Sequence, residues 1–483
     1  MRRIPHTLAF ASLAMISGCA VGPDFKKPAA PESKSYSSET TKPQEGDAQK
    51  LVASMDIPGQ WWTLFHSRPL DDLIAESITA NADLAAAQAA LRAARENVRA
   101  QQGAYWPGVN ANFSPTRQKT AGSLSPVPSS SAYIYSLYTA QLSISYAPDV
   151  FGLNRRTVES LEAQADAQRY QVEATYLTLT SNLVNAAIGE ASLRAQIEAT
   201  QAIVEDQSKT LASFQKQFDL GNVAEADVAA QRGSLAQAQA TLPPLQKQLE
   251  QQRDAIKALA GKFPDADVAA FPALENFTLP NELPLSLPAQ LVNQRPDVLA
   301  AEAQLHSASA QIGIAVANRL PNFSIDAGVG SAADKIGELF KAGTGFWNLA
   351  ANLAQPIFQG GTLMHKQRAA EAAYDQAAAQ YRATVIAALQ NVADTLHAID
   401  ADTRAWKAAL ASETAARRSL DIAQAQLKLG DVNYLAMLSA ETTWRQAKLA
   451  LIQAQATRLT DSVALFQALG GGWWSKSATA NRG

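Results

Sequence analysis

The sequence predicts a mainly helical protein with a membrane β-barrel, in which two similar halves each contribute two strands. Three observations predict this fold class. Four short segments alternate apolar with polar residues, long segments rich in alanine and glutamine lack proline, and the pattern of the first half recurs in the second. A period of two is typical of strands and a period near 3.6 is typical of helices, so both element types are expected.

The overall composition argues against several classes of protein. The 483 residues carry a formal net charge of −3, and no basic cluster is interleaved with aromatic residues, which argues against nucleic-acid binding. No apolar run of about 18 residues follows the N-terminus, so no membrane-spanning helix is expected. The single cysteine cannot form an internal disulfide, and the five histidines lack metal-ligand spacing. We therefore expect no metal and no cofactor.

The N-terminus has the pattern of a secreted lipoprotein. A charged start and a short apolar run precede Ser17-Gly18-Cys19, which predicts a signal peptide over residues 1–18 and an acylated Cys19. The alternative is an ordinary signal peptide with an incidental cysteine. Residues 19–60 are rich in Pro, Ser, Lys and Glu and are predicted to form an acylated tether, with the lipid in the outer membrane.

A duplication divides the rest of the chain. Residues 70–113 recur at residues 284–328 with a constant offset. Repeats of this length indicate one duplicated unit rather than several domains. The predicted first repeat covers residues 61–275, the second covers residues 276–474, and a C-terminal tail covers residues 475–483.

Each repeat contains two candidate strands whose polar positions are mostly small residues. Four strands cannot close a barrel, which needs about eight, and a lipid-facing sheet cannot leave an edge unpaired. Either the strands form an ordinary soluble sheet or several chains pool them. Aromatic residues at the strand ends, such as Trp106 and Trp347, favour a membrane barrel with interfacial girdles. The four predicted strands cover approximately residues 108–116, 138–147, 322–330 and 346–355.

Long helices are expected after each strand pair. No proline occurs within residues 153–219, and small or apolar residues recur there every seven positions, as in a coiled coil. Gly221 and Gly430 mark turns into returning helices. Pro243-Pro244 is expected to interrupt or kink the first returning helix. A fibrous coiled coil is the alternative, but small seam residues favour packing of many helices around a wide bore.

Several short motifs resemble those of outer-membrane efflux lipoproteins, in the NodT-like branch of the TolC/OprM superfamily. This resemblance implies a homotrimer whose 12-stranded barrel continues as a periplasmic α-helical barrel. It also implies docking to a periplasmic adaptor (membrane fusion) protein and an inner-membrane pump. The motifs are Val21-Gly22-Pro23-Asp24-Phe25, Trp61-Trp62 with Leu64-Phe65, Arg295-Pro296-Asp297-Val298, Asn391-Val392-Ala393-Asp394 and Ala468-Leu469-Gly470-Gly471-Gly472-Trp473.

The resemblance also indicates two groups of functional residues. The family's acidic and basic constriction positions fall on Ser439 and Thr442 here, so a different aperture is expected. The adaptor-docking tips are assigned to Leu220, Gly221, Asn222, Leu429, Gly430 and Asp431. The possible aperture constriction is assigned to Asp227, Tyr434, Leu438 and Glu441, with Asp431 as a further candidate.

The predicted function is a passive exit duct of a tripartite efflux system for drugs or other small toxic compounds. No phosphate-binding loop and no catalytic constellation occurs, so no catalytic residue is expected and the energy must come from a partner. The alternatives are a type I secretion exit channel, a periplasmic coiled-coil adaptor or scaffold lipoprotein, and a lipid-anchored enzyme. An adaptor would need a lipoyl-like β domain, which the sequence lacks.

Overall fold

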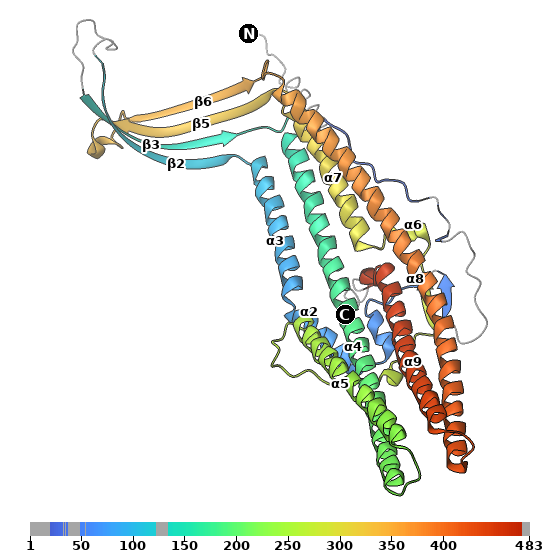
Figure 1. Cartoon of the computed structure of the whole chain (residues 1–483). Helices are drawn as coiled ribbons and strands as arrows, with labels where there is room; N and C mark the ends of the chain where they lie inside the picture. Colours follow the sequence, from blue (N-terminus) through green and yellow to red (C-terminus); the bar gives the residue numbers. More distant parts are fainter. Residues whose placement is uncertain are drawn as a thin grey trace. The chain divides into compact units, whose positions relative to one another are not determined.

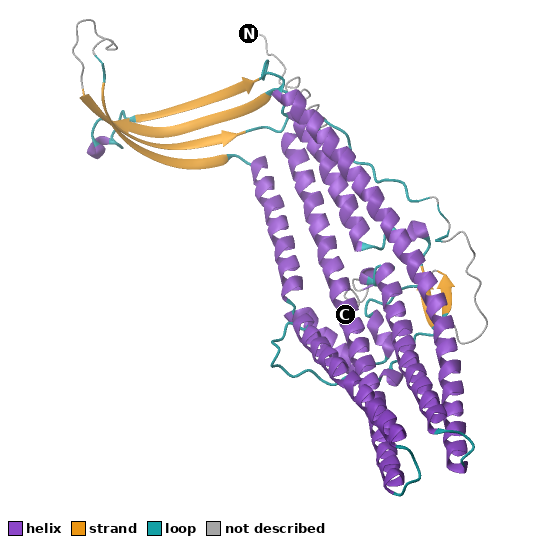
Figure 2. Ribbon diagram, viewed as in Figure 1, coloured by secondary structure: helices purple, strands orange, loops and turns teal. Residues whose placement is uncertain are grey.

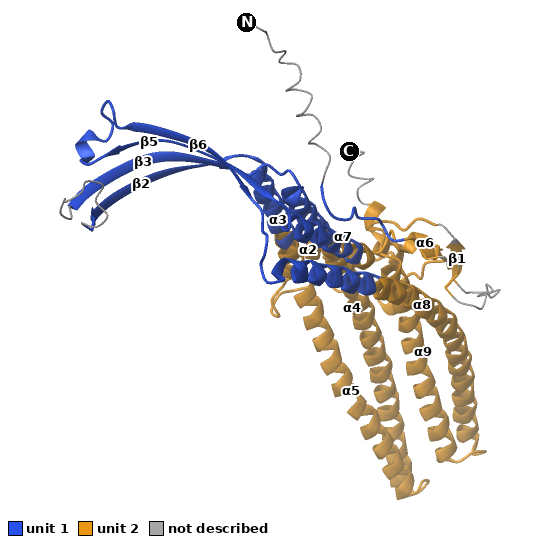
Figure 3. Ribbon diagram, turned by 90° about the horizontal axis from the view of Figure 1, so that it is seen from above, with its two compact units in different colours: residues 1–28, 90–168, 301–381 blue, residues 29–89, 169–300, 382–483 orange. Residues whose placement is uncertain are grey.

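The computed structural model describes residues 20–31, 33, 35, 36, 49–53, 55–121 and 134–475. The predicted signal peptide, the predicted lipid-attachment residue Cys19 and residues 476–483 of the predicted tail lie outside the described residues. The chain forms two compact units, coloured separately in Figure 3. Unit 1 comprises residues 1–28, 90–168 and 301–381, and unit 2 comprises residues 29–89, 169–300 and 382–483.

Unit 1 contains one four-stranded antiparallel sheet, which confirms the predicted strand number (Figures 1 and 2). Its strands follow the order β2 (Gly108–Lys119), β3 (Ile134–Tyr146), β5 (Asn322–Ala333) and β6 (Gly345–Ala354). The β2–β3 hairpin is longer than expected, because pairing continues as far as Lys119 opposite Ile134. Pro115 does not end β2, since this strand lies at the edge of the sheet, where a missing N–H is tolerated.

The helices beside the strands are held together by small polar side chains. In unit 1, the Ser160 and Ser307 hydroxyls lie 2.9 Å apart, and Gln311 donates to Ser160 at 2.8 Å. These contacts join the first part of α4 to α7. The four helices that adjoin the strands are α3 (Ala82–Gln102), α4 (Leu153–Asp219), α7 (Pro296–Ala317) and α8 (Thr362–Leu429).

Unit 2 contains the two returning helices, α5 (Glu225–Leu259) and α9 (Tyr434–Ala468). The α5 helix runs without interruption through Pro243-Pro244, so the expected break in the helix does not occur. The prolines deprive the carbonyls of Gln239 and Ala240 of their helical donors, but both residues are exposed, so water can bind these carbonyls. Among the helices that the structure describes, none is long and apolar enough to cross a membrane.

Short elements complete unit 2. Strand β1 (Lys50–Ala53) pairs in parallel with β4 (Glu282–Leu285), so part of the N-terminal region is fixed to the second repeat rather than free. The other elements are the 3-10 helices η1 (Trp61–Phe65) and η4 (Leu274–Asn276), and the α-helices α2 (Arg68–Ala80) and α6 (Pro288–Leu291). In unit 1, η2 (Gly103–Tyr105) and η5 (Ile336–Glu338) are further 3-10 turns.

The core of unit 2 includes Trp61 and Arg295, which belong to two of the short motifs in the sequence. Trp61 is fully buried and stacks on Phe466, with the ring centroids 5.3 Å apart. The buried Arg295 guanidinium donates to the Ala468 carbonyl at 3.1 Å and pairs with Asp297 at 2.6 Å. These residues therefore join segments that are far apart in sequence and stabilise the fold.

Candidate functional site

One face of the four-stranded sheet is an exposed apolar surface. The register places Val109, Ile144, Ala327 and Leu349 side by side across all four strands. The next row on this face comprises Ala111, Leu142, Val329 and Trp347. Trp347 is 78% exposed and Leu349 is 68% exposed, although both are large apolar side chains. An apolar surface that extends across four strands indicates contact with lipid or with another molecule.

The opposite face is polar and hydrogen-bonded. Asn112 donates to the Ser143 hydroxyl at 3.2 Å, and Asn352 donates to the Asp326 carboxylate at 2.9 Å. Ser324 also donates to Asp326, at 3.1 Å. Asp326 thus lies on the polar face, as a charge that lines a water-filled lumen would.

The sheet has two open edges within the described part of the chain. Strand β2 pairs only with β3, and β6 pairs only with β5. An edge strand presents unpaired N–H and C=O groups, which pair readily with another chain. The arrangement therefore favours association through these edges.

Two hairpin tips form the far ends of the long helices, where α4 meets α5 and α8 meets α9. Gly221 and Gly430 adopt φ angles of +78° and +79°, which residues other than glycine rarely adopt. The next amides, of Asn222 and Asp431, donate back to helix carbonyls at 2.8 and 3.0 Å. The two tips have the same backbone geometry, and their most exposed apolar residues are Leu220 and Leu429.

The two tips cap their returning helices differently. The Asp227 carboxylate accepts the Ala224 amide at 3.3 Å at the start of α5. At the start of α9 the residue in the equivalent position is Ala436, and the Asn433 side chain accepts the Ala436 amide at 3.0 Å instead. Both arrangements satisfy an N–H group that the first helical turn leaves free.

A cavity of about 730 Å³ lies beside the tips, between the two hairpins of unit 2. Three of the predicted aperture residues, Asp227, Tyr434 and Glu441, line it. Leu438 packs against the adjoining apolar cluster, whereas Asp431 is exposed at its tip and is not among the cavity-lining residues.

Two buried polar groups define this cavity. Tyr434 packs on Phe214 with ring centroids 4.1 Å apart, and its hydroxyl has no hydrogen-bond partner within the described residues. Burial raises the pKa of Tyr434, and the Glu441 and Asp227 carboxylates raise it further. Burial also raises the pKa of Glu441, which a hydrogen bond from Gln207 and the Arg445 charge partly offset. A bulky ring and a largely buried carboxyl group thus both line the cavity near the tips.

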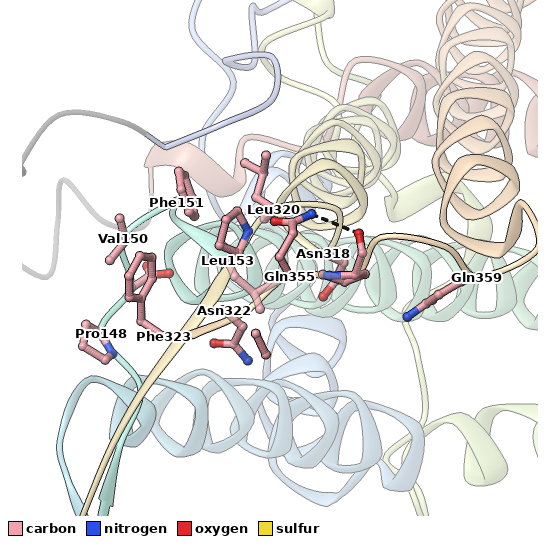
Figure 4. A pocket seen from close by; sticks show the side chains of 15 residues that line it. Pro148, Val150, Phe151, Leu153, Asn318, Leu320, Asn322, Phe323, Gln355 and Gln359 are labelled. Carbon is pink, nitrogen blue, oxygen red and sulfur yellow. Dashed lines mark hydrogen bonds between the residues drawn. The ribbon is translucent and has the colours of Figure 1, made fainter. Parts of the chain in front are cut away.

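A second cavity, of about 440 Å³, lies where the strands meet the helices of unit 1 (Figure 4). Phe151 and Phe323 line it, with ring centroids 6.4 Å apart, together with the amide side chains of Asn318, Asn322 and Gln355. No local sequence pattern predicts this cavity, because its wall combines three separate strand–helix junctions. The prolines near these junctions, Pro148, Pro321 and Pro356, are the only local signal.

Comparison with known proteins identifies the family. The family model for outer membrane efflux proteins matches residues 73–262 and 287–471, which together cover most of the chain and both repeats. The chain belongs to the outer membrane efflux protein family. A curated relative is the probable efflux pump outer membrane protein TtgC of Pseudomonas putida, which is 29% identical and covers 97% of this chain and 96% of its own length. The pyoverdine export outer membrane protein OpmQ of Pseudomonas aeruginosa is 28% identical, and the match covers 86% of this chain and 88% of the length of OpmQ.

Solved structures agree with this assignment. The outer-membrane channel OprN is similar with a TM-score of 0.86 and 26% identity, over 94% of this chain and 100% of that chain. The MtrE outer membrane channel of Neisseria gonorrhoeae has a TM-score of 0.82 and 26% identity, over 94% of this chain and 99% of that chain. The CmeC channel of Campylobacter jejuni has a TM-score of 0.88 over 96% of this chain and 98% of that chain. Its sequence identity is 22%, so it supports the fold alone.

As an outer membrane efflux protein, the chain is an outer-membrane channel of efflux pumps and not an enzyme. The predicted TolC-like fold, with duplicated halves and four strands per chain, is confirmed. The alternatives of a periplasmic adaptor and of a lipid-anchored enzyme are wrong, because both repeats match the channel family.

Proposed function

We propose that three copies of the chain close a 12-stranded barrel in the outer membrane, with the apolar face toward lipid. The supporting observation is the apolar surface across all four strands, combined with two unpaired edges. Four strands are too few to enclose a pore, so closure needs other copies. The polar face with Asp326 then lines the lumen, and the paired helices extend the duct.

We infer that the duct exports small toxic compounds and is passive. Relatives carry names such as toluene efflux pump and antibiotic efflux pump outer membrane protein, both from Pseudomonas putida. These names favour small molecules over the protein cargo of a type I secretion channel. Transport then draws on an inner-membrane pump, which a periplasmic adaptor connects to the helical tips.

We also propose that this protein belongs to the NodT-like lipoprotein branch and carries acyl chains on Cys19. The support is the chain's only cysteine, placed directly after Ser17-Gly18 at the end of a signal-like segment. Mass spectrometry of the mature N-terminal peptide tests this assignment: a lipid mass on Cys19 supports it, and an unmodified cysteine rejects it.

We expect valine at Gly430 to impair efflux without preventing channel formation. A residue with a side chain pays about 1–2 kcal/mol in the left-handed conformation, so the tip must rearrange where we propose that the adaptor docks. The measurement is antibiotic susceptibility together with adaptor crosslinking. Gly233→Ala is the matched control, because Gly233 lies inside α5 with open space around it. Wild-type resistance and crosslinking in Gly430→Val would exclude the tip as the docking site.

We expect Tyr434→Ala to open the proposed aperture. The change removes the ring that packs on Phe214 beside the cavity, so large antibiotics should enter a strain that lacks the pump. Tyr434→Phe is the control, since it keeps the ring and removes only a hydroxyl without a hydrogen-bond partner in the described residues. Equal uptake by all three proteins would show that Tyr434 is a packing residue and not part of the constriction.

A further inference from the structure

The segment that follows Cys19 is bound to unit 1 rather than extended away from it. The Val21 amide donates to the Phe151 carbonyl at 3.1 Å. Phe25 stacks on His306 with ring centroids 4.3 Å apart and an interplanar angle of 15°. Lys27 pairs with Glu302 at 3.0 Å. Residues 20–28 therefore form contacts along their length, in contrast to the free tether that their composition indicates.

Arg156, in the first turns of α4, holds the centre of this segment. Only 4% of the residue is exposed, and its guanidinium donates to the Val21 carbonyl at 3.0 Å and the Gly22 carbonyl at 3.3 Å. The same guanidinium pairs with Asp24 at 2.8 Å and with Glu159 at 2.7 Å. Because this buried arginine binds two main-chain carbonyls, it fixes the backbone position of the segment and does not only pair with its charge.

Glycines allow the segment to approach the helices closely. Gly22 has a φ angle of +92°, and a Cβ atom there would collide with the main chain of Gly313. A Cβ at Gly313 would lie 2.8 Å from the Arg156 side chain, and one at Gly152 would lie 2.8 Å from the Ala20 Cα. Three glycines at the points of contact show that the surface is shaped to receive this segment. We call residues 20–28 with Arg156, Gly152 and Gly313 the N-terminal clasp.

The N-terminal clasp leads directly to the cavity at the base of the sheet. Ala20 lies against Gly152, and one peptide bond, about 3.8 Å between Cα atoms, separates it from Cys19. Gly152 lies between Phe151 and Leu153, and both of these residues line the 440 Å³ cavity (Figure 4). This volume is within the range of cavities that bind small organic groups.

The chemistry of the cavity suits a lipid group attached to the chain. Phe151, Leu153, Leu320 and Phe323 offer apolar contacts, and Asn318 and Asn322 carry amide groups that can donate to ester carbonyls. We propose that the clasp holds the ester-linked head of the lipid on Cys19 in this cavity, so that its acyl chains enter the membrane at the base of the strands. This proposal depends on the acylation of Cys19 proposed above.

Limited proteolysis tests the clasp. A lysine-specific protease can cut after Lys26 only when the segment leaves both α4 and α7, so cleavage reports local opening. We expect Arg156→Met to speed this cut by about tenfold or more, and Arg155→Met to leave it unchanged. Arg155 is the matched control, because it pairs with Asp149 and not with the segment. Asp24→Asn is a second test variant, since its side chain is 90% exposed and the change removes its ion pair with Arg156 without leaving a cavity. Cleavage of both test variants at the wild-type rate would overturn the clasp.

Photocrosslinking tests the seat of the lipid. The photoreactive residue p-benzoylphenylalanine replaces Phe323, and the same replacement at the exposed Phe340 is the control. An adduct between position 323 and the acylated N-terminal peptide, absent at position 340 and lost in Cys19→Ser, is the expected result. Adducts with bilayer phospholipid alone, or no adduct, would contradict the proposed position of the Cys19 lipid in the cavity. If mass spectrometry shows an unmodified Cys19, the acylation proposal fails instead, whereas the proteolysis result still decides the clasp.

Discussion

Arginine in place of Leu349 should prevent the protein from accumulating as an assembled channel in the outer membrane. Leu349 lies on β6 in the apolar row with Ile144 and Ala327, and it is exposed in the single chain. An arginine facing the middle of the bilayer costs about 2–4 kcal/mol, and every copy in the barrel carries the change. In a soluble sheet, the same substitution at an exposed position would change stability by less than about 0.5 kcal/mol.

The neighbouring residue on β6 provides the control. Asn348 points to the opposite, polar face and pairs in register with Gly328, so Asn348→Arg is expected to assemble normally. Heat-modifiable migration of outer-membrane fractions on a gel measures assembly for both variants. Normal assembly of Leu349→Arg, or equal loss in both variants, would show that the apolar face does not contact lipid.

Alanine in place of Trp61 should produce the largest loss of stability among the changes considered. Trp61 is fully buried, stacks on Phe466 and meets Phe65 edge-on at 6.4 Å. Truncation of such an aromatic side chain costs about 3–5 kcal/mol, because the surrounding residues fill the void only in part. We expect the unfolding temperature in detergent to fall by more than about 5 °C.

Phe263→Ala is the control for this prediction, because Phe263 belongs to the same unit but is exposed. Thermal unfolding followed by circular dichroism compares the two variants with the wild-type protein. If Trp61→Ala unfolded at the wild-type temperature, Trp61 would not be part of the core on which unit 2 depends, and its shared motif would need a different explanation.

The four strands and the two tips could be predicted because each is encoded by a local pattern. Alternation of apolar and polar residues identifies a strand without knowledge of its partner, and Gly221 or Gly430 marks a turn by itself. The four aperture residues are a hypothesis made because the family's constriction residues are absent at Ser439 and Thr442. The structure brings Asp227, Tyr434 and Glu441 to one cavity, and their role remains a prediction.

The missed features depend on contacts between distant residues. The composition of residues 20–28 is that of a tether, and only the position of Arg156, more than a hundred residues later, shows that the segment is bound. Strand β1 is four residues long and pairs with β4 across two hundred residues, so its sequence carries too little periodicity to be recognised. The conformation of these segments is determined by long-range packing against a fixed partner rather than by local sequence preference.

The most direct test of the account is the conductance of the purified protein in planar lipid bilayers. If several copies close their sheets into one lipid-embedded barrel, detergent-purified oligomers should insert and give discrete, reproducible current steps, and Leu349→Arg should give none. A monomeric product that stays soluble without detergent and never conducts would contradict the central claim.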